Sequence, residues 1–591
     1  MTQDKTASAQ RRGAIALALV LLGILVIPIA MDDQFIYHIF VTICIFAALS
    51  TAWNIVGGYA GQLSLGHAIF YGIGAYAAVM LTNLGITPWI GMFVGAFFAV
   101  IAAIVVSYPC FRLHGPFFAL ATIAFLEVFR VLALHFRSFT GGATGMMIPL
   151  NVGWEWMVFR DRLPALIIAF GLLLLALAVA WWIRNRRLGF QLIATRERES
   201  AARAAGVGTV RVRLVGVSIS AALCAMVGSF HAMYLTFIEP EAVFSLTFSI
   251  QIALFALIGG IGTIFGPLLG AVMLVPITEF ARGWLGSGAL GLHGFVYGVV
   301  LVLVVLFMPN GIMGLVQRFF EPDRTPPEAE PASVAPEPRA SEARSFGEDV
   351  LQVEGLDKHF GGLHVTNNVS FSLKEGEVLA LIGPNGAGKT TVFNMISGFL
   401  KADAGSVVVR GADGQFHSPT TPGDYAAIGV GRTFQIVQPF ASMTVEENIM
   451  VGAFHRHHNV VDAREAARET AHRLGLGRWL HAEARGLTIG GLKRLEVARV
   501  MAMEPRILLL DEVMAGINQT DVRRAVDLML SIRDSGVSII AIEHVMQAVM
   551  SLSDRVIVLN SGEIIAEGTP QEVVRDATVI EAYLGKEFAN A

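Results

Sequence analysis

The first 320 residues of this 591-residue chain carry very few charged side chains, and this scarcity constrains the fold more than any other feature. They hold 29 of the 90 Asp, Glu, Lys and Arg residues, whereas residues 321–591 hold 61. A helix that crosses a membrane needs about 20 mostly apolar residues. Ten segments are candidates, several of them short or glycine-rich: 13–30, 35–56, 62–82, 88–108, 116–136, 163–183, 214–236, 247–264, 266–281 and 291–308. We therefore expect residues 1–320 to form an all-α polytopic domain of about ten helices in a lipid bilayer.

Composition narrows the class of protein further. Hydrophobic residues make up 54% of the chain and charged residues 15%, against about 25% charged in an ordinary soluble domain. This balance excludes a disordered chain and a protein that coats nucleic acid, so no nucleic-acid partner is expected. The three cysteines, Cys44, Cys110 and Cys224, have neither a paired nor a metal-binding spacing.

Lysine and arginine favour one side of the predicted membrane domain. With ten spans, the basic residues on the same side as the N-terminus are Lys5, Arg11, Arg12, Arg112, the arginines of 184–213 and Arg318. Cytoplasmic loops carry the excess of Lys and Arg. We therefore expect the N-terminus and the C-terminal half of the chain to be cytoplasmic.

Glycine is concentrated in two stretches of the membrane half. The first holds Gly57, Gly58, Gly61, Gly66, Gly72 and Gly74, and the second holds Gly259, Gly260, Gly262, Gly266 and Gly270. Single glycines let helix backbones approach closely, which is a packing role. Broken or re-entrant helices at these clusters would instead line a solute path. We favour packing for single glycines and the path for the two clusters as wholes.

Two residues of opposite charge, Glu127 and Arg130, lie in the fifth predicted span. Charges inside a membrane are costly and are usually paired or functional. Residues three apart share a helix face, so we expect these two to form a structural pair. His67 and His114 are interpreted as packing or interface residues and not as ligands.

The segment Arg184–Arg213 is longer than a membrane anchor requires. It holds eight arginines and two glutamates around a short amphipathic run. Ala, Leu, Arg and Glu favour helix, and Gly206 is placed to end one. A positive-inside anchor needs only a few arginines. We therefore interpret this segment as a cytoplasmic helix that docks on another domain.

A change in composition marks the boundary between the two halves. Glu321–Asp349 contains six prolines, many alanines and acids, and almost no large apolar residue. Proline fixes φ and like charges repel, so such a stretch stays extended and solvated. The expected organisation is a membrane domain at 1–320, a linker at 321–349 and an α/β domain at 350–591.

The C-terminal half carries a phosphate-binding motif. Val378–Ile382 is a short apolar run typical of a buried parallel strand. The residues that follow fit G-x-x-x-x-G-K-[ST], and they are Gly383, Pro384, Asn385, Gly386, Ala387, Gly388, Lys389, Thr390 and Thr391. Backbone N–H groups of such a loop surround phosphates, the lysine reaches the β and γ oxygens, and the Thr390 hydroxyl ligates Mg²⁺. We therefore predict a P-loop nucleotide-binding domain.

Acidic residues follow a second predicted strand. Ile507–Leu510 leads directly into Asp511 and Glu512. An aspartate at a strand end can hold Mg²⁺, and the adjacent glutamate can polarise the attacking water. A third apolar strand, Val537–Ile542, leads to His544, a candidate for a hydrogen bond to the γ-phosphate.

Residues from about 350 to 587 resemble the nucleotide-binding subunit of an ABC transporter. Beyond the P-loop, the resemblance rests on the order and spacing of HFGG at Phe360, RTFQ at Gln435, LTIGG at Leu487–Gly491, AGIN at Ala515–Asn518 and His544. It implies that ATP stacks its adenine on Phe360 and is contacted by the signature residues Thr488 and Gly490. It also implies that Glu512 and His544 are catalytic and that Thr390, Gln435 and Asp511 hold Mg²⁺.

The sequence departs from the family pattern at three positions. Thr488 replaces the usual serine, Gly491 the usual glutamine and Asn518 the usual aspartate. These departures concern the ATP site to which this chain donates its signature. They do not affect Lys389 or Asp511, which serve the chain's own P-loop side.

The membrane half resembles the permease of high-affinity branched-chain amino acid importers. The motifs concerned are Gly61–His67, His114–Thr122, Thr140–Gly145, Gly259–Pro267 and Pro309–Gly314, with Arg184–Arg213 in the place of the coupling helix. The α/β half is similar to the ATPase of the same importers. The resemblance thus implies a permease and an ATPase fused in one chain, which imports branched-chain or related small amino acids across a bacterial inner membrane.

Alternative functions remain open at this point. Related permeases take other amino acids, amides or urea, and no substrate-binding constellation can be identified in these spans. An exporter or flippase also joins permease and ATPase in this order, but usually with six long spans. A non-transporting ATPase with a membrane anchor would need only one or two membrane-spanning helices.

The expected partners follow from the composite ATP sites of the family. One chain supplies one P-loop side, one signature and one permease half. The resemblance therefore implies a second permease subunit, a second ABC ATPase subunit and a periplasmic solute-binding protein. The departures at Thr488, Gly491 and Asn518 favour a heteromer, and a homodimer is the alternative.

Overall fold

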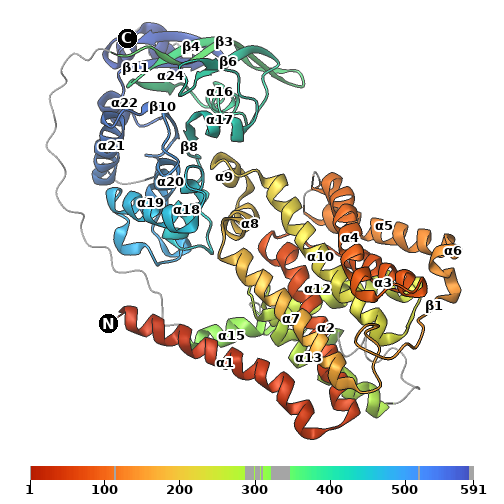
Figure 1. Cartoon of the computed structure of the whole chain (residues 1–591). Helices are drawn as coiled ribbons and strands as arrows, with labels where there is room; N and C mark the ends of the chain where they lie inside the picture. The colour runs from red at the N-terminus through yellow and green to blue at the C-terminus, as the bar shows by residue number, and fades with distance from the viewer. Residues whose placement is uncertain are drawn as a thin grey trace. The chain divides into compact units, whose positions relative to one another are not determined.

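The computed structural model of the chain describes residues 2–111, 113, 115–285, 298–299, 302, 306–307, 311–320, 346–516 and 519–584. The chain divides into two compact units (Figure 1). The helical unit consists of Met1–Arg196 and Thr209–Arg324, and the α/β unit consists of Glu197–Gly208 and Thr325–Ala591. The predicted span 291–308 and the predicted linker 321–349 lie mostly outside the described residues.

Helices make up almost all of the helical unit, as its apolar sequence predicts. They are α1 (Thr2–Met31), α2 (Gln34–Asn54), η1 (Ile55–Tyr59), α3 (His67–Asn83), α4 (Pro88–Cys110), α5 (Pro116–His135), α6 (Arg137–Thr140), η2 (Gly142–Thr144), α7 (Arg162–Arg184), α8 (Arg187–Glu197), α10 (Thr209–Leu235), α11 (Pro240–Val243), α12 (Leu246–Gly260), α13 (Gly266–Leu285) and α15 (Gly311–Phe320). A short antiparallel pairing joins β1 (Met146–Met147) to β2 (Phe237–Ile238). Helix α10 packs against α3 and α4, and α2 packs against α7 and α13.

Six helices of this unit are long and apolar enough to cross a membrane. They are Gln34–Tyr59, Pro88–Cys110, Pro116–His135, Arg162–Arg184, Thr209–Leu235 and Pro240–Gly260, and two shorter apolar helices are Leu17–Met31 and Gly266–Phe280. The described residues therefore contain six to eight apolar helices, which confirms the all-α membrane class but not the count of ten. The predicted span 62–82 begins too early, because residues 62–66 are not helical and α3 begins at His67.

Both glycine-rich stretches interrupt helices. The chain leaves helical structure between η1 and α3, and again between α12 and α13. The two interruptions meet at Asn54, whose Nδ2 donates to the Thr263 carbonyl at 2.7 Å. The Gly262 N–H in turn donates to Asn54 Oδ1 at 2.8 Å. The broken helices expected at the glycine clusters are therefore present, whereas a solute path along them stays a prediction.

Close backbone contact explains individual glycines. A Cβ added to Gly74 would lie 2.0 Å from the Ala225 carbonyl oxygen. One added to Gly259 would lie 1.7 Å from the Gly266 carbonyl oxygen. Larger side chains would therefore force α3 away from α10 and α12 away from α13, which confirms the packing role at these positions.

The polar residues singled out in the membrane half have partners within it. Arg130 Nε donates to Glu127 Oε2 at 3.0 Å and Arg130 Nη2 to Oε1 at 2.5 Å, so the predicted pair is confirmed. His67 is fully buried, with its ring nitrogens 2.9 Å from Ser64 Oγ and 3.0 Å from Ser220 Oγ. It is a packing residue, as predicted, and His114 lies outside the described residues.

The α/β unit contains two sheets. Its strands are β3 (Asp349–Phe360), β4 (Leu363–Lys374), β5 (Val378–Ile382), β6 (Ala404–Arg410), β7 (Phe416–His417), β8 (Val430–Arg432), β9 (Ile507–Asp511), β10 (Ser538–Ile542), β11 (Arg555–Asn560) and β12 (Glu563–Gly568). The larger sheet has the order β12-β11-β5-β10-β9-β8, parallel except at β12, and the smaller antiparallel sheet has the order β4-β3-β6-β7.

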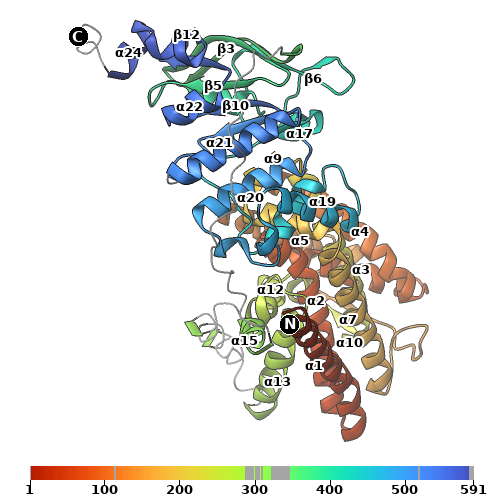
Figure 2. The same ribbon diagram turned by 90° about the vertical axis from the view of Figure 1, so that its left-hand side faces the viewer.

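Helices cover the larger sheet and form a separate helical group. They are α9 (Glu199–Ala204), α16 (Lys389–Met395), α17 (Pro422–Ile428), α18 (Val445–Ala453), α19 (Val460–Arg473), η4 (Gly477–Trp479), η5 (Ala484–Gly486), α20 (Ile489–Met501), α21 (Gln519–Asp534), α22 (Met546–Leu552), α23 (Pro570–Arg575) and α24 (Ala577–Leu584). In Figure 1, α18, α19 and α20 lie together at the end of this unit away from the smaller sheet, and Figure 2 shows α19 and α20 there as well.

Every residue of β5, β9 and β10 is buried. Parallel strands that are buried on both faces need apolar side chains throughout, which explains the composition of these three strands. The register pairs Ile542 of β10 with Asp511 of β9. Because parallel strands end at the same edge of a sheet, the loops after these three strands converge there.

The short segment Glu197–Gly208 belongs to the α/β unit. Helix α9 ends as the glycine predicts: Gly206 has φ +74°, its N–H donates to the Arg203 carbonyl at 3.1 Å, and the Val207 N–H donates to the Ala202 carbonyl at 3.0 Å. The region is two helices, α8 and α9, because the backbone of Arg198 is extended.

Candidate functional site

The phosphate-binding loop lies at the carboxyl end of β5 and leads into α16. Its glycines adopt backbone angles that other residues rarely take, with φ of +153° at Gly383, +81° at Gly386 and +94° at Gly388. A Cβ at Gly383 would lie 2.1 Å from the Leu559 carbonyl oxygen, and one at Gly388 2.6 Å from the Val365 carbonyl oxygen. The loop geometry therefore requires glycine at these positions, and glycine-rich turns of this kind direct backbone N–H groups toward an anion.

Lys389 folds back onto this loop. Its Nζ donates to the Gly383 carbonyl at 2.6 Å and to the Pro384 carbonyl at 2.8 Å. Burial lowers the pKa of Lys389, and the nearby carboxylates of Glu512 and Asp511 oppose that shift. The ammonium group is thus held against the backbone of the loop.

Asp511 ends β9 and is almost completely buried. Its backbone N–H donates to Thr433 Oγ1 at 3.1 Å, and its Oδ2 lies 3.4 Å from Arg432 Nη2. Burial raises the pKa of this carboxyl, while Arg432 opposes the shift. Its other oxygen, Oδ1, has no hydrogen-bond partner. A buried carboxylate oxygen without a partner is suited to a divalent cation, so the site fits Mg²⁺.

Glu512 is placed by an unusual backbone conformation. Its φ is +48°, which costs free energy for a residue with a Cβ and recurs at functional sites. Its N–H donates to the Ile542 carbonyl at 2.9 Å. The side chain accepts a 2.9 Å hydrogen bond from Gln435 Nε2, and its Oε2 lies 3.7 Å from His544 Nδ1. The structure therefore brings together three of the predicted site residues, from three separate segments.

The remaining predicted residues have different surroundings. Thr390 and Thr391 lie in the first turn of α16, with Thr390 exposed. Phe360 is half exposed at the end of β3. Thr488 caps α20, where its Oγ1 accepts a 3.2 Å hydrogen bond from the Gly491 N–H, and Gly490 has open space around it. The signature residues therefore lie at the N-terminal end of α20. Asn518 lies outside the described residues.

Sequence reasoning missed Arg432, which ends β8. Its side chain is buried, donates to Ser397 Oγ at 2.6 Å, and faces Asp511. Its guanidinium also lies 5.2 Å from the centre of the Phe399 ring. A buried arginine needs a buried acid. The only signal in the sequence is its place within RTFQ.

Glu543 and Lys493 were also missed. Burial raises the pKa of Glu543 to about 7. Its Oε1 accepts from the Met514 N–H at 3.1 Å, and its Oε2 has no hydrogen-bond partner. Lys493 of α20 donates to the carbonyls of Glu512 and Ala515. It therefore ties the helix that begins with the signature to the loop that holds Glu512.

Family models match both halves of the chain. The model for the permease component of branched-chain amino acid transport systems matches residues 35–305. The ABC transporter model matches residues 366–515, and the model for branched-chain amino acid ATP-binding cassette transporters matches residues 563–589. The fold and site thus define an ABC ATPase, which binds ATP and hydrolyses it to drive transport.

Two of the curated relatives are covered over 95% or more of their length, and a third is covered over less than half. The high-affinity branched-chain amino acid transport ATP-binding protein LivG of Salmonella typhimurium is 40% identical over 260 residues, which cover 41% of this chain and 100% of LivG. The probable LivG of Archaeoglobus fulgidus is 36% identical over 248 residues, which cover 40% of this chain and 95% of that protein. The ribose import ATP-binding protein RbsA of a Chelativorans species is 35% identical, but only 45% of it is covered.

Together these matches identify the particular type of transporter. This chain belongs to the branched-chain amino acid ABC transporter family, and it carries the permease domain and the ATPase domain of that family fused in one chain. It is a multi-pass membrane protein with a soluble ATPase domain. The permease family model describes one component of a transport system.

Solved structures of ATP-binding cassettes are also similar to part of the chain. An ATP-binding cassette of an ABC transporter in its ADP conformation is 30% identical, covers 40% of this chain and 100% of its own, and has a TM-score of 0.37. A dimeric cassette in a post-hydrolysis state with ADP and Pi is 22% identical, covers 37% of this chain and 98% of its own, and has a TM-score of 0.34.

Proposed function

We propose that this chain is a subunit of an importer that brings branched-chain amino acids, or related small amino acids and amides, across a bacterial inner membrane. The observation that carries the proposal is that the permease half and the ATPase half match branched-chain amino acid transport families independently. The chemistry is confined to the ATPase half, and selectivity for the solute resides largely in a separate periplasmic binding protein.

At the ATP site, the P-loop from Gly383 to Thr391 holds the phosphates and Phe360 stacks on adenine. Thr390, Asp511 and Gln435 hold Mg²⁺, which when bound neutralises charge on the β and γ phosphates. Glu512 acts as the general base that takes a proton from the attacking water, and His544 bonds the γ-phosphate. The 2.9 Å contact of Glu512 with Gln435 and its 3.7 Å separation from His544 support these roles.

Residues Thr488 and Gly490 contact ATP in the site of a neighbouring subunit. Their position at the first turn of α20, with Gly490 unobstructed, supports such a role. Each complete ATP site therefore needs a second cassette.

The segment Arg184–Arg213 transmits closure of the cassettes to the membrane helices. Glu197 Oε1 accepts from Ser442 Oγ at 2.8 Å, and Ser200 Oγ donates to the side chain of Gln438. Gln438 lies in the same loop as Gln435, which contacts Glu512. A change at Glu512 thus reaches α9 through one loop of the chain.

The membrane path lies beside the paired helix interruptions at the two glycine clusters. Unwound backbone at membrane depth is tolerated where protein buries it or where it lines a path. The link from Asn54 to Gly262 and Thr263 supports a gate that opens when the two interruptions separate.

A second permease subunit covers the face of α5. Only 28% of the apolar window of this helix is buried within the chain. The Glu127 side chain on that helix is 57% exposed and that of Arg130 is 30% exposed. Charges facing lipid are costly, so a protein partner at this face is expected. We favour a different permease and a different ATPase, with a homodimer as the alternative.

Orientation follows the distribution of Lys and Arg. Loops rich in arginine lie in the cytoplasm, and the segment Arg184–Arg213 is rich in arginine. The N-terminus and the ATPase domain lie on the same side as this segment and are therefore cytoplasmic.

Transport in reconstituted vesicles tests these assignments. The full chain is incorporated with candidate permease, ATPase and solute-binding subunits, and ATP is supplied on the cassette side. ATP-dependent uptake of labelled leucine, isoleucine or valine is expected only with the binding protein. Movement of the amino acid in the opposite direction would contradict import. Full turnover by the pure chain alone would contradict the heteromer and support a homodimer.

A further inference from the structure

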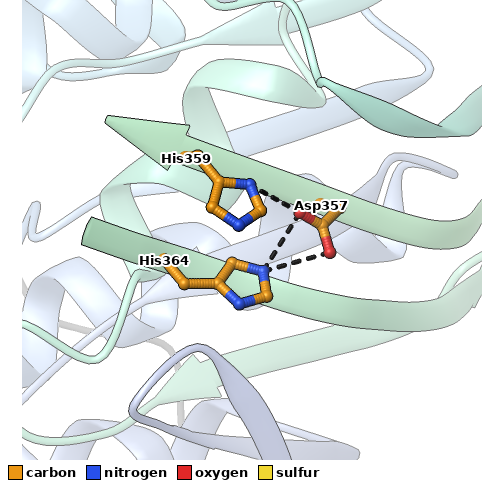
Figure 3. A group of neighbouring side chains, drawn as sticks. All are labelled: Asp357, His359 and His364. Carbon is orange, nitrogen blue, oxygen red and sulfur yellow. Dashed lines mark hydrogen bonds and ion pairs between the residues drawn. The ribbon is translucent and has the colours of Figure 1, made fainter. Parts of the chain in front are cut away.

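A cluster of two histidines and one aspartate lies on the β3–β4 hairpin, apart from the catalytic residues (Figure 3). Asp357 Oδ1 lies 3.1 Å from His359 Nδ1 and 3.0 Å from His364 Nε2. Asp357 Oδ2 lies 3.1 Å from His364 Nε2. One nitrogen of each ring therefore faces the same carboxylate.

The hairpin fixes this arrangement. His359 and His364 are direct partners across the two strands, and Asp357 lies two residues before His359 on the same strand. The pairing of the two strands is irregular on both sides of Lys358, and Figure 3 shows the three side chains gathered together beside the hairpin. The imidazole rings are parallel, with centres 4.0 Å apart and an angle of 8° between them. Packing of one ring on the other holds both nitrogens in place.

The charge balance around the cluster favours a cation. Asp403 accepts hydrogen bonds from Lys358 Nζ at 2.6 Å and from the His359 N–H at 2.8 Å. The lysine is thus neutralised by Asp403 and not by Asp357. The Asp357 side chain faces the two imidazole rings, and an ion could be held between these three groups.

We propose that Asp357, His359 and His364 bind a zinc ion. Ligand atoms at about 2.0–2.1 Å from a tetrahedral zinc lie about 3.3 Å from one another. The oxygen–nitrogen distances of 3.0–3.1 Å approach that spacing, and the three ligand atoms all lie within 4.8 Å of one another, so the side chains can close around one ion by local movement. Two imidazoles and a carboxylate suit zinc, and water completes the fourth position because the side chains are 22–51% exposed.

An occupied site would also restrain the turn that carries Phe360. His359 directly precedes Phe360, and His364 directly follows Leu363, the partner of Phe360 across the hairpin. An ion held by both histidines would cross-link the two strands on either side of this half-exposed aromatic ring. Zinc would therefore reduce the motion of the hairpin whether or not nucleotide is bound.

The competing explanation is that Asp357 simply accepts hydrogen bonds from the two rings. A matched pair elsewhere in the α/β unit separates the two cases. His417 Nε2 lies 3.0 Å from both carboxylate oxygens of Asp413, also in an exposed position, but the pair has no second histidine. The Asp413–His417 pair has the same hydrogen bonding and lacks the third ligand.

The test measures zinc binding to the full-length chain in detergent, without a histidine tag or nucleotide, by competition with a chromophoric chelator. Wild type is expected to bind one more equivalent of Zn²⁺ than the variant Asp357→Asn/His359→Gln/His364→Gln. His359→Gln and His364→Gln should each weaken that equivalent by at least the roughly 10–100-fold that loss of an outer-shell partner costs. His417→Gln should leave it unchanged.

Hydrogen exchange locates the ion independently. Zn²⁺ should slow amide exchange of residues 357–366 in wild type and in His417→Gln, and should have no effect there in His364→Gln. Equal zinc stoichiometry in wild type and the triple variant would overturn the proposal. Unchanged exchange at 357–366 in zinc-loaded wild type would overturn it as well, because the extra ion would then lie elsewhere.

Discussion

Gln435 donates a 2.9 Å hydrogen bond from its Nε2 to Oε2 of Glu512. The two residues are far apart in the sequence, one after β8 and the other after β9. Glu512 has a left-handed backbone, and its N–H is tied to Ile542 of β10. The position of the Glu512 carboxylate therefore depends on the segments at the ends of β8, β9 and β10, and not on its own segment alone.

Glu512→Gln should abolish most ATP hydrolysis and leave ATP binding intact. The amide keeps the size of the side chain but cannot take a proton from water, a function worth roughly 10²–10⁴-fold in rate. ATPase assays and nucleotide-binding titrations measure the two effects separately. Glu504→Gln is the control, because Glu504 is also a glutamate with positive φ, at +55°, and is exposed. Hydrolysis near the wild-type rate in Glu512→Gln would show that the general base lies elsewhere.

Arg432→Met should destabilise the ATPase domain strongly. It leaves the buried Asp511 without its cation, and breaking a buried pair costs about 3–5 kcal/mol. Differential scanning calorimetry of the full chain would detect a lower unfolding temperature. The double variant Arg432→Met/Asp511→Asn should recover much of the loss, because neither charge of the pair is then left without the other. Arg485→Met, in a pair whose arginine is 70% exposed, should change stability by no more than about 1 kcal/mol. A double variant as unstable as the single one would contradict this account.

The titration of Glu543 should lower the stability of the ATPase domain as pH rises from about 4.5 to about 7. Burial raises the pKa of this carboxyl from 4.5 to about 7, so the folded state retains a proton that the unfolded state releases. Stability therefore decreases as pH rises through this window, by at most about 1.4 kcal/mol per pH unit, and the contribution levels off above it.

Glu543→Gln should remove this part of the slope. Glu496, with a pKa also raised to about 7 by burial, contributes a slope of the same sign, so the difference between wild type and variant is the quantity to measure. Unfolding temperatures from pH 5 to 8 provide it. Glu465→Gln, on the exposed side of α19, should leave the profile unchanged. Parallel profiles for wild type and Glu543→Gln would contradict the predicted shift.

Asn54→Leu should uncouple the two helix interruptions in the membrane half. It removes the hydrogen bonds to Gly262 and Thr263 and leaves their backbone groups without that partner, at about 1–3 kcal/mol for a buried group. We expect lower thermal stability of the helical unit and a larger loss of vesicle uptake than of ATP hydrolysis. Asn185→Leu, which removes only an exposed bond at the end of α7, is the control. Wild-type uptake by Asn54→Leu would exclude a role for this contact in transport.

Hydropathy predicted the membrane class but not the number of long helices. A window of apolar residues does not report whether a helix is continuous. The predicted span 62–82 includes Gln62–Gly66, yet the chain there is irregular and α3 starts at His67. Backbone contact between the glycine clusters, visible only in three dimensions, decides where the helices stop.

The sequence by itself determined the features that lie within a few consecutive residues. The P-loop, the buried strands β5, β9 and β10, and the acids after β9 all follow from local pattern, because a strand, its turn and the next helix are built from neighbouring residues. Only the tertiary structure decided which distant side chains meet: Arg432 on Asp511, Gln435 on Glu512, and Asn54 on Gly262. Those contacts depend on strand order, register and helix packing, which bring together residues that no local spacing relates.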